Sequence, residues 1–342
     1  MNKLSDNPLA ISLATSLATL TIYLFSSTAL ALEPSALSVA AEKAKRSTVG
    51  ILKPTNQRGT ISGQPPFTVR GSGTHIGNGY ILTARHAIEK QNRGKTIAPE
   101  EIYIITGDLH EIEAHFVGFN AFLDIALYHI QEFSELPSLE HATFGPLETR
   151  SGDKVFTVGY PLGWGPALSF GQVGNPNTFL DTIQSRLIQI DLSACSGNSG
   201  GGLFNQQGLI VGVVHAIIQT ETAQEKRLCS RFAFAVPGLI VKKIVHSLIR
   251  GEQPKFSKLG IKLNVIIING RWAITVGKAA GAAQKAGFKK GDLFLAIDDH
   301  PIYTASQLKN YLIEHTEPGQ QVAITILRGE KTRTLKVILG SS

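Results

Sequence analysis

Ser199 lies near the middle of the chain in a run of small residues, Ser196 to Gly201. A hydroxyl is a poor nucleophile at neutral pH, so a catalytic serine needs a base and hydrogen-bond donors for the oxyanion that forms. Glycine at Gly197 lets the backbone adopt a positive φ, which would aim the amides of Gly197 and Ser199 at one carbonyl oxygen. By itself, this run is equally consistent with an ordinary turn between strands.

Two upstream segments contain the partners that a catalytic serine needs. His86 follows the apolar segment 79–84, and Asp124 begins the apolar segment 124–127. A carboxylate at the start of a buried strand is costly unless a partner takes up its charge, and an imidazole N–H would do so. The order His86, Asp124, Ser199 is one of the chain orders in which the Ser-His-Asp triad has arisen. We therefore predict nucleophilic catalysis by Ser199, with His86 as its base.

Five short motifs, taken in this order, resemble the HtrA (Deg) family of serine proteases. They are Gly-Tyr-Ile-Leu-Thr before His86, Asp-Ile-Ala-Leu at 124–127, Gly-Tyr-Pro-Leu-Gly at 159–163, Gly-Asn-Ser-Gly-Gly at 197–201 and Arg-Phe-Ala-Phe-Ala-Val-Pro at 231–237. The resemblance implies an all-β, chymotrypsin-like double β-barrel and a homotrimer. It also implies an exported endopeptidase that cleaves unfolded or misfolded proteins in envelope quality control and stress response. Short strands punctuated by Gly and Pro, with no long amphipathic helix between them, favour the same barrel pair.

The chain of 342 residues is long enough for two domains, because single cores rarely grow beyond about 250–300 residues. The last part resembles a PDZ domain, with an amphipathic helix over 305–315. The domains expected in chain order are a signal peptide or membrane anchor at 1–31, an N-terminal segment with a short helix at 32–48, a trypsin-like protease domain at 49–250, a linker at 251–257 and the PDZ domain at 258–342.

The formal net charge of +7 arises mostly after residue 250, where 13 Lys and Arg face 7 Asp and Glu. This excess favours acidic partners such as peptide carboxylates, and no basic run suggests nucleic acid. The PDZ resemblance implies that C-terminal peptides add to a sheet edge, with their carboxylate held at Leu259, Gly260 and Ile261. The alternative is a degenerate module that only packs on the protease.

An uncharged stretch at 8–32 ends in Ala29-Leu30-Ala31, which is typical of a secretory signal cleaved after Ala31. The stretch is also long enough to span a bilayer, so a retained anchor with membrane association is the alternative. Either route exports the rest of the chain, and we expect a periplasmic or cell-envelope protein.

Export permits a disulfide bond between the two cysteines, Cys195 and Cys229. Trypsin-like enzymes often have such a bond between a position just before the serine and a downstream loop. HtrA proteases usually have Asn at the position of Cys195, so a bond here would be a departure from the family. The alternative is two unpaired small hydrophobic residues.

The resemblance also implies which residues line the pocket for the substrate residue before the cut: Ala194, Ala216, Ile217 and Ile218. No acid stands six residues before Ser199, so we expect a preference for small or medium apolar residues rather than Lys or Arg. His215 adjoins this pocket. It is either a plain strand residue or an acceptor for a substrate Glu side chain.

Three further histidines, His75, His110 and His115, are expected at exposed strand positions. None has the spacing of a metal-ligand set with cysteine or carboxylate, so no metal and no cofactor are expected. A second class of function also fits the sequence. It is a chaperone or a PDZ-tethered peptide-binding scaffold whose hydrolysis is marginal or depends on an activator.

Overall fold

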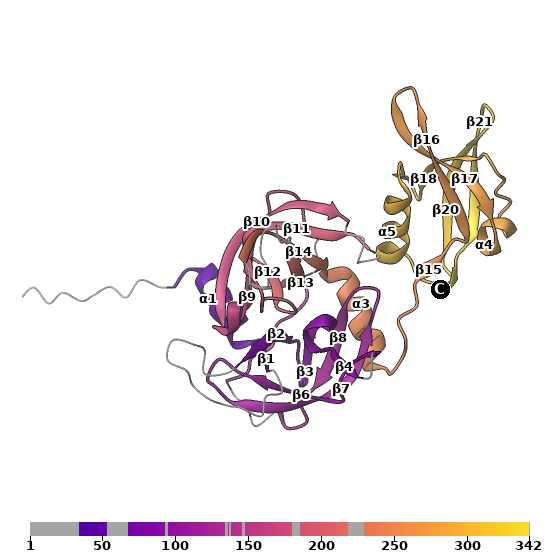
Figure 1. Cartoon of the computed structure of the whole chain (residues 1–342). Helices are drawn as coiled ribbons and strands as arrows, with labels where there is room; N and C mark the ends of the chain where they lie inside the picture. The colour runs from indigo at the N-terminus through magenta and orange to yellow at the C-terminus, as the bar shows by residue number, and fades with distance from the viewer. Residues whose placement is uncertain are drawn as a thin grey trace, which may run out of the picture. The chain divides into compact units, whose positions relative to one another are not determined.

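The computed structural model of the chain describes residues 34–52, 68–92, 95–133, 136, 138–145, 148–179, 185–217 and 229–341 (Figure 1). The predicted signal or anchor, at 1–31, lies outside the described residues. Among the helices of the described ranges, none has the length and apolar character to cross a membrane.

Six strands of the N-terminal half close into a barrel, drawn in purple in Figure 1, with the order β1-β2-β3-β8-β7-β6. Alternate side chains of these strands point into the barrel, so β-branched and aromatic residues such as Ile81, Ile104 and Tyr128 are fully buried. The strands are β1 (Thr48–Leu52), β2 (Val69–His75), β3 (Tyr80–Ala84), β6 (Glu101–Ile105), β7 (Glu111–Asn120) and β8 (Ile125–His129). A short hairpin, β4 (Lys90–Asn92) with β5 (Lys95–Ile97), pairs outside the barrel.

A second closed barrel follows, with the order β10-β11-β14-β13-β12-β9. Its strands are β9 (Lys154–Gly159), β10 (Ala167–Thr178), β11 (Leu187–Cys195), β12 (Gly202–Asn205), β13 (Ile210–Ile217) and β14 (Cys229–Pro237). Apolar side chains of β11, β13 and β14 fill its interior. Two closed six-stranded barrels confirm the predicted all-β double β-barrel.

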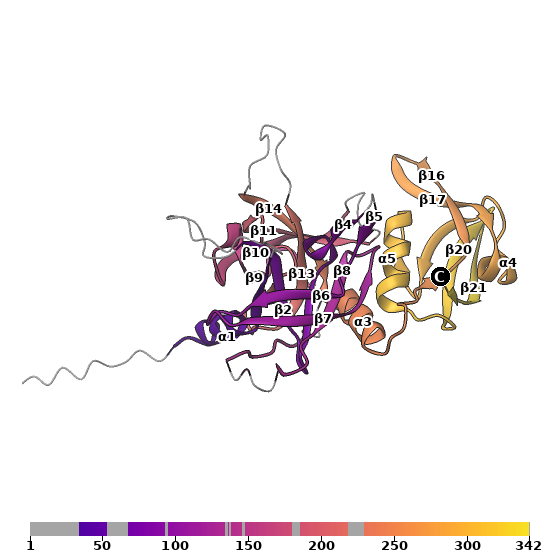
Figure 2. The ribbon, with the colours of Figure 1, turned by 60° about the horizontal axis from the view of Figure 1, so that its bottom comes forward.

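Helices connect and cover the barrels. Helix α1 (Ala36–Arg46) is capped by the hydroxyl of Ser35, and α2 (Arg85–Ile88) is a single turn after β3. Helix α3 (Gly238–Ile249) follows β14 and lies beside β7 and β8 in Figures 1 and 2. Its buried face shares one apolar cluster with β8 of the first barrel and β13 of the second. Burial of this face therefore holds the two barrels together.

The C-terminal module is a sheet with the order β16-β17-β18-β20-β21, in which β19 pairs with β18. The helix expected over 305–315 is present as α5, and Thr304 and Gln307 form a capping box at its start. The remaining elements are β15 (Ser257–Lys258), β16 (Ile261–Ile268), β17 (Arg271–Ala279), α4 (Gly281–Lys285), β18 (Leu293–Ile297), β19 (His300–Pro301), α5 (Ala305–His315), β20 (Gln321–Arg328), β21 (Lys331–Ile338) and β22 (Gly340–Ser341).

The expectation that His75 faces solvent is wrong. His75 ends β2 and is only 3% exposed. Its Nδ1 is 2.8 Å from the main-chain oxygen of Glu140, and its Nε2 accepts from the Gly79 amide at 3.1 Å. Burial lowers the pKa of His75, which favours the neutral imidazole that this donor and acceptor pair requires. The residue is a structural link between the β2–β3 turn and the segment after the first barrel.

Candidate active site

Strand pairing brings His86 next to Asp124. Strands β3 and β8 run antiparallel, with Ala84 opposite Ile125, so the end of β3 and the start of β8 meet at one edge of the first barrel. Helix α2 begins at this edge, and the Arg85 amide donates to the main-chain oxygen of Asp124 at 2.8 Å. Asp124 itself has a φ of 56°, a left-handed conformation that Asp tolerates better than most residues.

Two N–H groups of His86 donate to the carboxylate of Asp124. The main-chain N–H donates to Oδ1 at 2.9 Å, and the ring Nδ1 donates to Oδ2. This arrangement leaves Nε2 on the opposite side of the ring, as a general base requires. The His86 side chain is 43% exposed, whereas that of Asp124 is 13% exposed. The acid is thus largely shielded from water while the imidazole is accessible.

A second imidazole also donates to Asp124. His215, on β13, places its Nδ1 2.8 Å from the same Oδ2 that accepts from His86. The two rings lie edge to face with their centroids 5.5 Å apart. Burial on its own would raise the pKa of Asp124, but the hydrogen bonds from His215 and His86 outweigh burial and hold that pKa well below its usual value. Asp124 is therefore a carboxylate throughout the neutral range.

Ser199 lies in the loop between β11 and β12, and its hydroxyl donates to the main-chain oxygen of His215 at 3.3 Å. Within the described ranges, Ser199 and His86 share no hydrogen bond. The structure therefore brings the three predicted catalytic residues to one place without the last link of the triad. Such links are often long or misaligned without substrate.

The loop around Ser199 depends on Gly197. Its φ is 106°, and a Cβ at this position would lie 2.2 Å from the main-chain oxygen of Tyr160. In the part of the chain that the structure describes, the amides of Gly197 and Ser199 donate to no other protein group. Both N–H groups are thus available to a ligand oxygen, as the predicted oxyanion site requires.

The predicted disulfide bond between Cys195 and Cys229 is present. The two residues face each other across β11 and β14, with their Cα atoms 3.9 Å apart. The bond therefore joins the strand that leads into the Ser199 loop to the strand that begins after residues 218–228.

The pocket expected before the cut is described only in part. Ala194 is buried on β11. Ala216 and Ile217 lie on β13, opposite Phe234 and Ala233 of β14, and their side chains fall outside the described part, as does the whole of Ile218. The assignment of these residues to the pocket stays a prediction.

The predicted carboxylate-binding turn of the C-terminal module, Leu259 to Ile261, leads into β16, which is an edge strand of its sheet. Gly260 has a φ of 76°, and a Cβ there would lie 2.4 Å from the main-chain oxygen of Ala280. The Ala283 amide donates to the oxygen of Leu259 at 2.9 Å. The turn is thus held against the start of α4, beside a sheet edge that pairs with no further strand in the described residues.

By residue type, His86, Asp124 and His215 could hold a metal ion, since their ligand atoms lie within 4.8 Å of one another. Two ligands of one tetrahedral zinc ion lie about 3.3 Å apart, because each bond is about 2.0–2.1 Å long. The 2.8 Å between His215 Nδ1 and Asp124 Oδ2 is a hydrogen-bond distance instead. The geometry fits a hydrogen-bonded network.

The other two histidines of the sequence analysis lie on the outside of the first barrel. The His110 side chain is 64% exposed in the turn before β7, and that of His115 is 37% exposed on β7. His115 forms a second group of metal-ligand type with Glu101 and Glu113. These carboxylates are exposed or half-exposed, and nothing else at this surface points to an ion.

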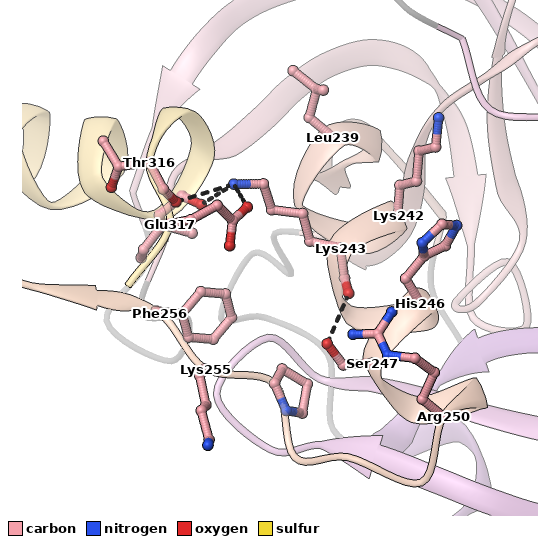
Figure 3. A pocket seen from close by; sticks show the side chains of 12 residues that line it. Leu239, Lys242, Lys243, His246, Ser247, Arg250, Lys255, Phe256, Thr316 and Glu317 are labelled. Atoms are coloured by element: carbon pink, nitrogen blue, oxygen red, sulfur yellow. Dashed lines mark hydrogen bonds and ion pairs between the residues drawn. The ribbon is translucent and has the colours of Figure 1, made fainter. Parts of the chain in front are cut away.

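A cavity of about 380 Å³ lies along α3 and contains none of the predicted catalytic residues (Figure 3). Several cationic side chains of α3 line it, and Lys243 among them donates to the main-chain oxygen of Thr316 at 3.3 Å and pairs with Glu317 at 3.1 Å. We assign it no part in the candidate active site.

Sequence reasoning missed the bond between His215 and Asp124. One signal for it was present: His215 is the only polar side chain in the apolar run 209–218. A lone polar side chain in a buried strand requires a buried partner. The identity of that partner was not readable from the pattern.

Comparisons with known proteins agree with the fold. Residues 71–213 match the trypsin-like peptidase domain, and residues 256–339 match the PDZ domain. The periplasmic pH-dependent serine endoprotease DegQ of Escherichia coli (strain K12) is 31% identical over 293 residues, which cover 81% of this chain and 60% of DegQ. The periplasmic serine endoprotease DegP of Salmonella typhimurium is 28% identical over 295 residues, covering 82% of this chain and 58% of DegP. The chain thus spans about 60% of the length of these relatives.

Solved structures share the fold. The HtrA-type protease AlgW with a decapeptide superimposes with a TM-score of 0.65 at 22% identity, covering 90% of this chain and 98% of AlgW. The serine endoprotease from Yersinia pestis gives a TM-score of 0.58 at 23% identity, covering 91% of this chain and 99% of that protein. These similarities extend over both barrels and the C-terminal module.

Proposed function

The chain belongs to the HtrA (Deg) family, which joins a trypsin-like peptidase domain to a PDZ domain, and from this premise we propose that it is a serine endopeptidase. The observation that carries the proposal is the pair of hydrogen bonds from His86 to Asp124, beside a serine in a glycine-rich loop with two available amides. No other arrangement in the described residues combines a nucleophile, an oriented base and oxyanion donors.

The proposed reaction begins when the Ser199 hydroxyl turns from the oxygen of His215 toward His86. His86 takes the proton as Ser199 attacks the peptide carbonyl, and it later returns the proton to the leaving amine. Asp124 keeps the imidazole in the required tautomer and stabilises its protonated form. The amides of Gly197 and Ser199 stabilise the oxyanion. Water then hydrolyses the acyl-enzyme by the same proton transfers.

We assign the substrates as unfolded or misfolded proteins, cut after small or medium apolar residues. The absence of an acid six residues before Ser199, where Ser193 stands, argues against Lys or Arg at the cut. An apolar pocket discriminates by about 1–3 kcal/mol for each misfitting methylene group, so the preference is graded rather than absolute.

The partners and location of the protein follow from its family. C-terminal peptides add to the edge of β16, with their carboxylate at Leu259, Gly260 and Ile261. The relatives named above are periplasmic serine endoproteases, which supports a periplasmic location. The role in envelope quality control rests on the family resemblance. The resemblance to the family also supports a homotrimer. The uncharged N-terminal stretch supports membrane association through residues 8–32.

One observation favours a second candidate function, a chaperone or peptide-binding scaffold whose hydrolysis waits for an activator. The Ser199 hydroxyl donates to the oxygen of His215 and not to His86. A resting enzyme with this arrangement would need a change at Ser199 before it could react.

The test is cleavage of unfolded β-casein by the purified chain beside its Ser199→Ala variant, with the product ends read by mass spectrometry. The variant is expected to fold and to lose about 10⁶-fold in kcat, as when a serine nucleophile is removed from another protease. Cuts after Val, Ile or Ala that vanish in the variant support the proposal. Equal cutting by both proteins would refute it.

A binding measurement separates the two candidates. The Ser199→Ala variant and the wild type are compared for suppression of β-casein aggregation, with and without a peptide that has a free C-terminal carboxylate. A scaffold keeps its whole effect in the variant, whereas a protease loses it. Cleavage that begins only when the peptide is added identifies an activator-dependent enzyme.

A further inference from the structure

We propose that His215 is a positioning residue for the reaction: its imidazole holds the Asp124 carboxylate opposite His86, while its main-chain oxygen holds the Ser199 hydroxyl in the resting enzyme. The inference deepens the proposed function and rests on it. It replaces both sequence-based interpretations of His215, as a plain strand residue and as an acceptor for a substrate Glu.

The hydrogen bonds around Asp124 fix the orientation of its carboxylate. Oδ1 accepts from the main-chain N–H of His86, and Oδ2 accepts from the Nδ1 atoms of His86 and His215. Donors on both oxygens, from two separate elements, prevent the carboxylate from rotating about its Cβ–Cγ bond. The orientation of His86 therefore depends on His215 as well as on Asp124.

The ring of His215 is directed at Asp124. Its side chain is 11% exposed, so its Nδ1–H needs an acceptor inside the protein, and Asp124 provides one at 2.8 Å. A residue that selected a substrate Glu would direct a donor toward the bound side chain. The described donor of His215 is directed at the catalytic acid instead.

The main chain of His215 contacts the nucleophile. The oxygen that accepts from Ser199 Oγ belongs to the same residue whose ring donates to Asp124. A shift of β13 at this position therefore moves the acceptor of the nucleophile and the partner of the acid together. His215 joins the two ends of the triad through a strand that contains neither of them.

The charges around His215 make its role measurable through pH. The titratable groups in contact with its ring are Asp124 and His86. Arg85, next to His86, is paired with Glu89 at 2.5 Å.

Among the described residues, the strands that pair with β13 place no charged residue opposite it, and the cationic side chains of α3, which also packs on β13, line the cavity along that helix. On β14, Phe234 and Ala235 lie opposite its neighbours, and on β12, Gly202 pairs with Val213. The Asp124 carboxylate accepts hydrogen bonds from two imidazoles. Removal of the His215 donor therefore strengthens the interaction between the Asp124 charge and the His86 ring. A stronger interaction with Asp124 favours the protonated form of His86, so the pH below which kcat/KM falls, the acid limb, should be higher in a variant without that donor.

The experiment compares His215→Val with His215→Thr. Both replacements are β-branched and suit a strand, but only Thr keeps a hydroxyl that can donate to Asp124. We expect His215→Val to lower kcat for β-casein peptides by about 10- to 100-fold with little change in KM, since it removes one charge-assisted hydrogen bond. His215→Thr should recover most of that loss and return the acid limb toward its wild-type position.

Two results would overturn the proposal. One is a His215→Val enzyme with wild-type kcat and an unmoved acid limb. The other is a variant whose main defect is loss of cuts after Glu, with raised KM for those sites, which would assign His215 to the specificity pocket. Thermal unfolding of each variant shows that a loss of kcat does not come from loss of the fold.

A second measurement does not depend on activity. Proton NMR of chains with ¹⁵N-labelled histidine, in the Ser199→Ala background, should show two far-downfield Nδ1–H resonances, and His215→Val should remove one. Absence of the second resonance overturns the proposal even in an active protease. Both resonances in a chain that cuts nothing would support the placement of His215 while refuting the proposed function.

Discussion

The hydroxyl of Ser72 donates to the main-chain oxygen of Gly197 at 2.6 Å and accepts from the Tyr160 amide at 2.9 Å. Ser72 lies on β2 of the first barrel and is fully buried, whereas Gly197 and Tyr160 belong to the second half of the fold. One buried side chain thus ties the nucleophile loop to the barrel that carries His86. The loop therefore has little freedom to shift when a side chain is added to it.

Gly197→Ala should disable the site by displacing the loop. A Cβ would lie 2.2 Å from the oxygen of Tyr160, at a φ of 106°, and neither strain can be relieved without moving the amides next to Ser199. Since loss of one oxyanion donor costs about 10²–10³ in kcat, we expect at least that loss in steady-state cleavage of peptides.

Gly152→Ala is the matched control. Its φ is 90°, but a Cβ there would meet nothing within 4 Å. It should cost about 1–2 kcal/mol of stability for the left-handed conformation and leave kcat unchanged. Equal kcat in the two variants would show that the contact with Tyr160 does not matter.

Removal of the disulfide bond by the double change Cys195→Ala, Cys229→Ala should destabilise the second barrel. The bond closes a segment with a sequence separation of 34 residues, for which the loop-entropy relation gives up to roughly 4 kcal/mol. Thermal unfolding measures the loss. A reducing agent should lower the stability of the wild type toward that of the double variant and leave the variant unaffected; wild-type stability in the variant would contradict the prediction.

Asp124→Asn should abolish part of the acid dependence of stability. The native pKa of Asp124 lies below that of the unfolded chain, about 3.9. The charge therefore contributes to the free energy of unfolding above about pH 4, and the contribution is lost as the pH falls toward the native pKa. The difference between wild type and variant, from denaturant unfolding, should shrink below about pH 4. The variant should also lose about 10⁴-fold in kcat, because the amide favours the wrong imidazole tautomer.

Asp108→Asn is a control for that measurement. Hydrogen bonds from the hydroxyls of Thr106 and Ser138 lower the pKa of Asp108, in the turn before β7, to about 2. This variant should lose stability over a similar acid range with kcat unchanged. If both variants kept full activity, Asp124 would have only a structural role.

The motifs of the sequence were informative where chemistry and fold are local. An apolar strand that ends before His86, and Asp124 at the start of another, predicted two strand ends, and antiparallel pairing of β3 with β8 brings them together. Short strands punctuated by Gly and Pro, with no long amphipathic helix between them, predicted the pair of barrels but not each of their strands. Burial in a closed barrel was not predictable for His75, because a seven-residue strand with six buried positions shows no period of two.

The sequence alone determined which residue types are available and in what order: a histidine and an aspartate at strand ends, a serine among glycines, and one cysteine on either side of that serine. Only the tertiary structure decided how they are connected. The bond from His215 to Asp124 joins residues 91 positions apart, and that from Ser72 to Gly197 joins residues 125 positions apart. Such contacts depend on how the two barrels pack against each other, and no local periodicity or motif specifies that packing.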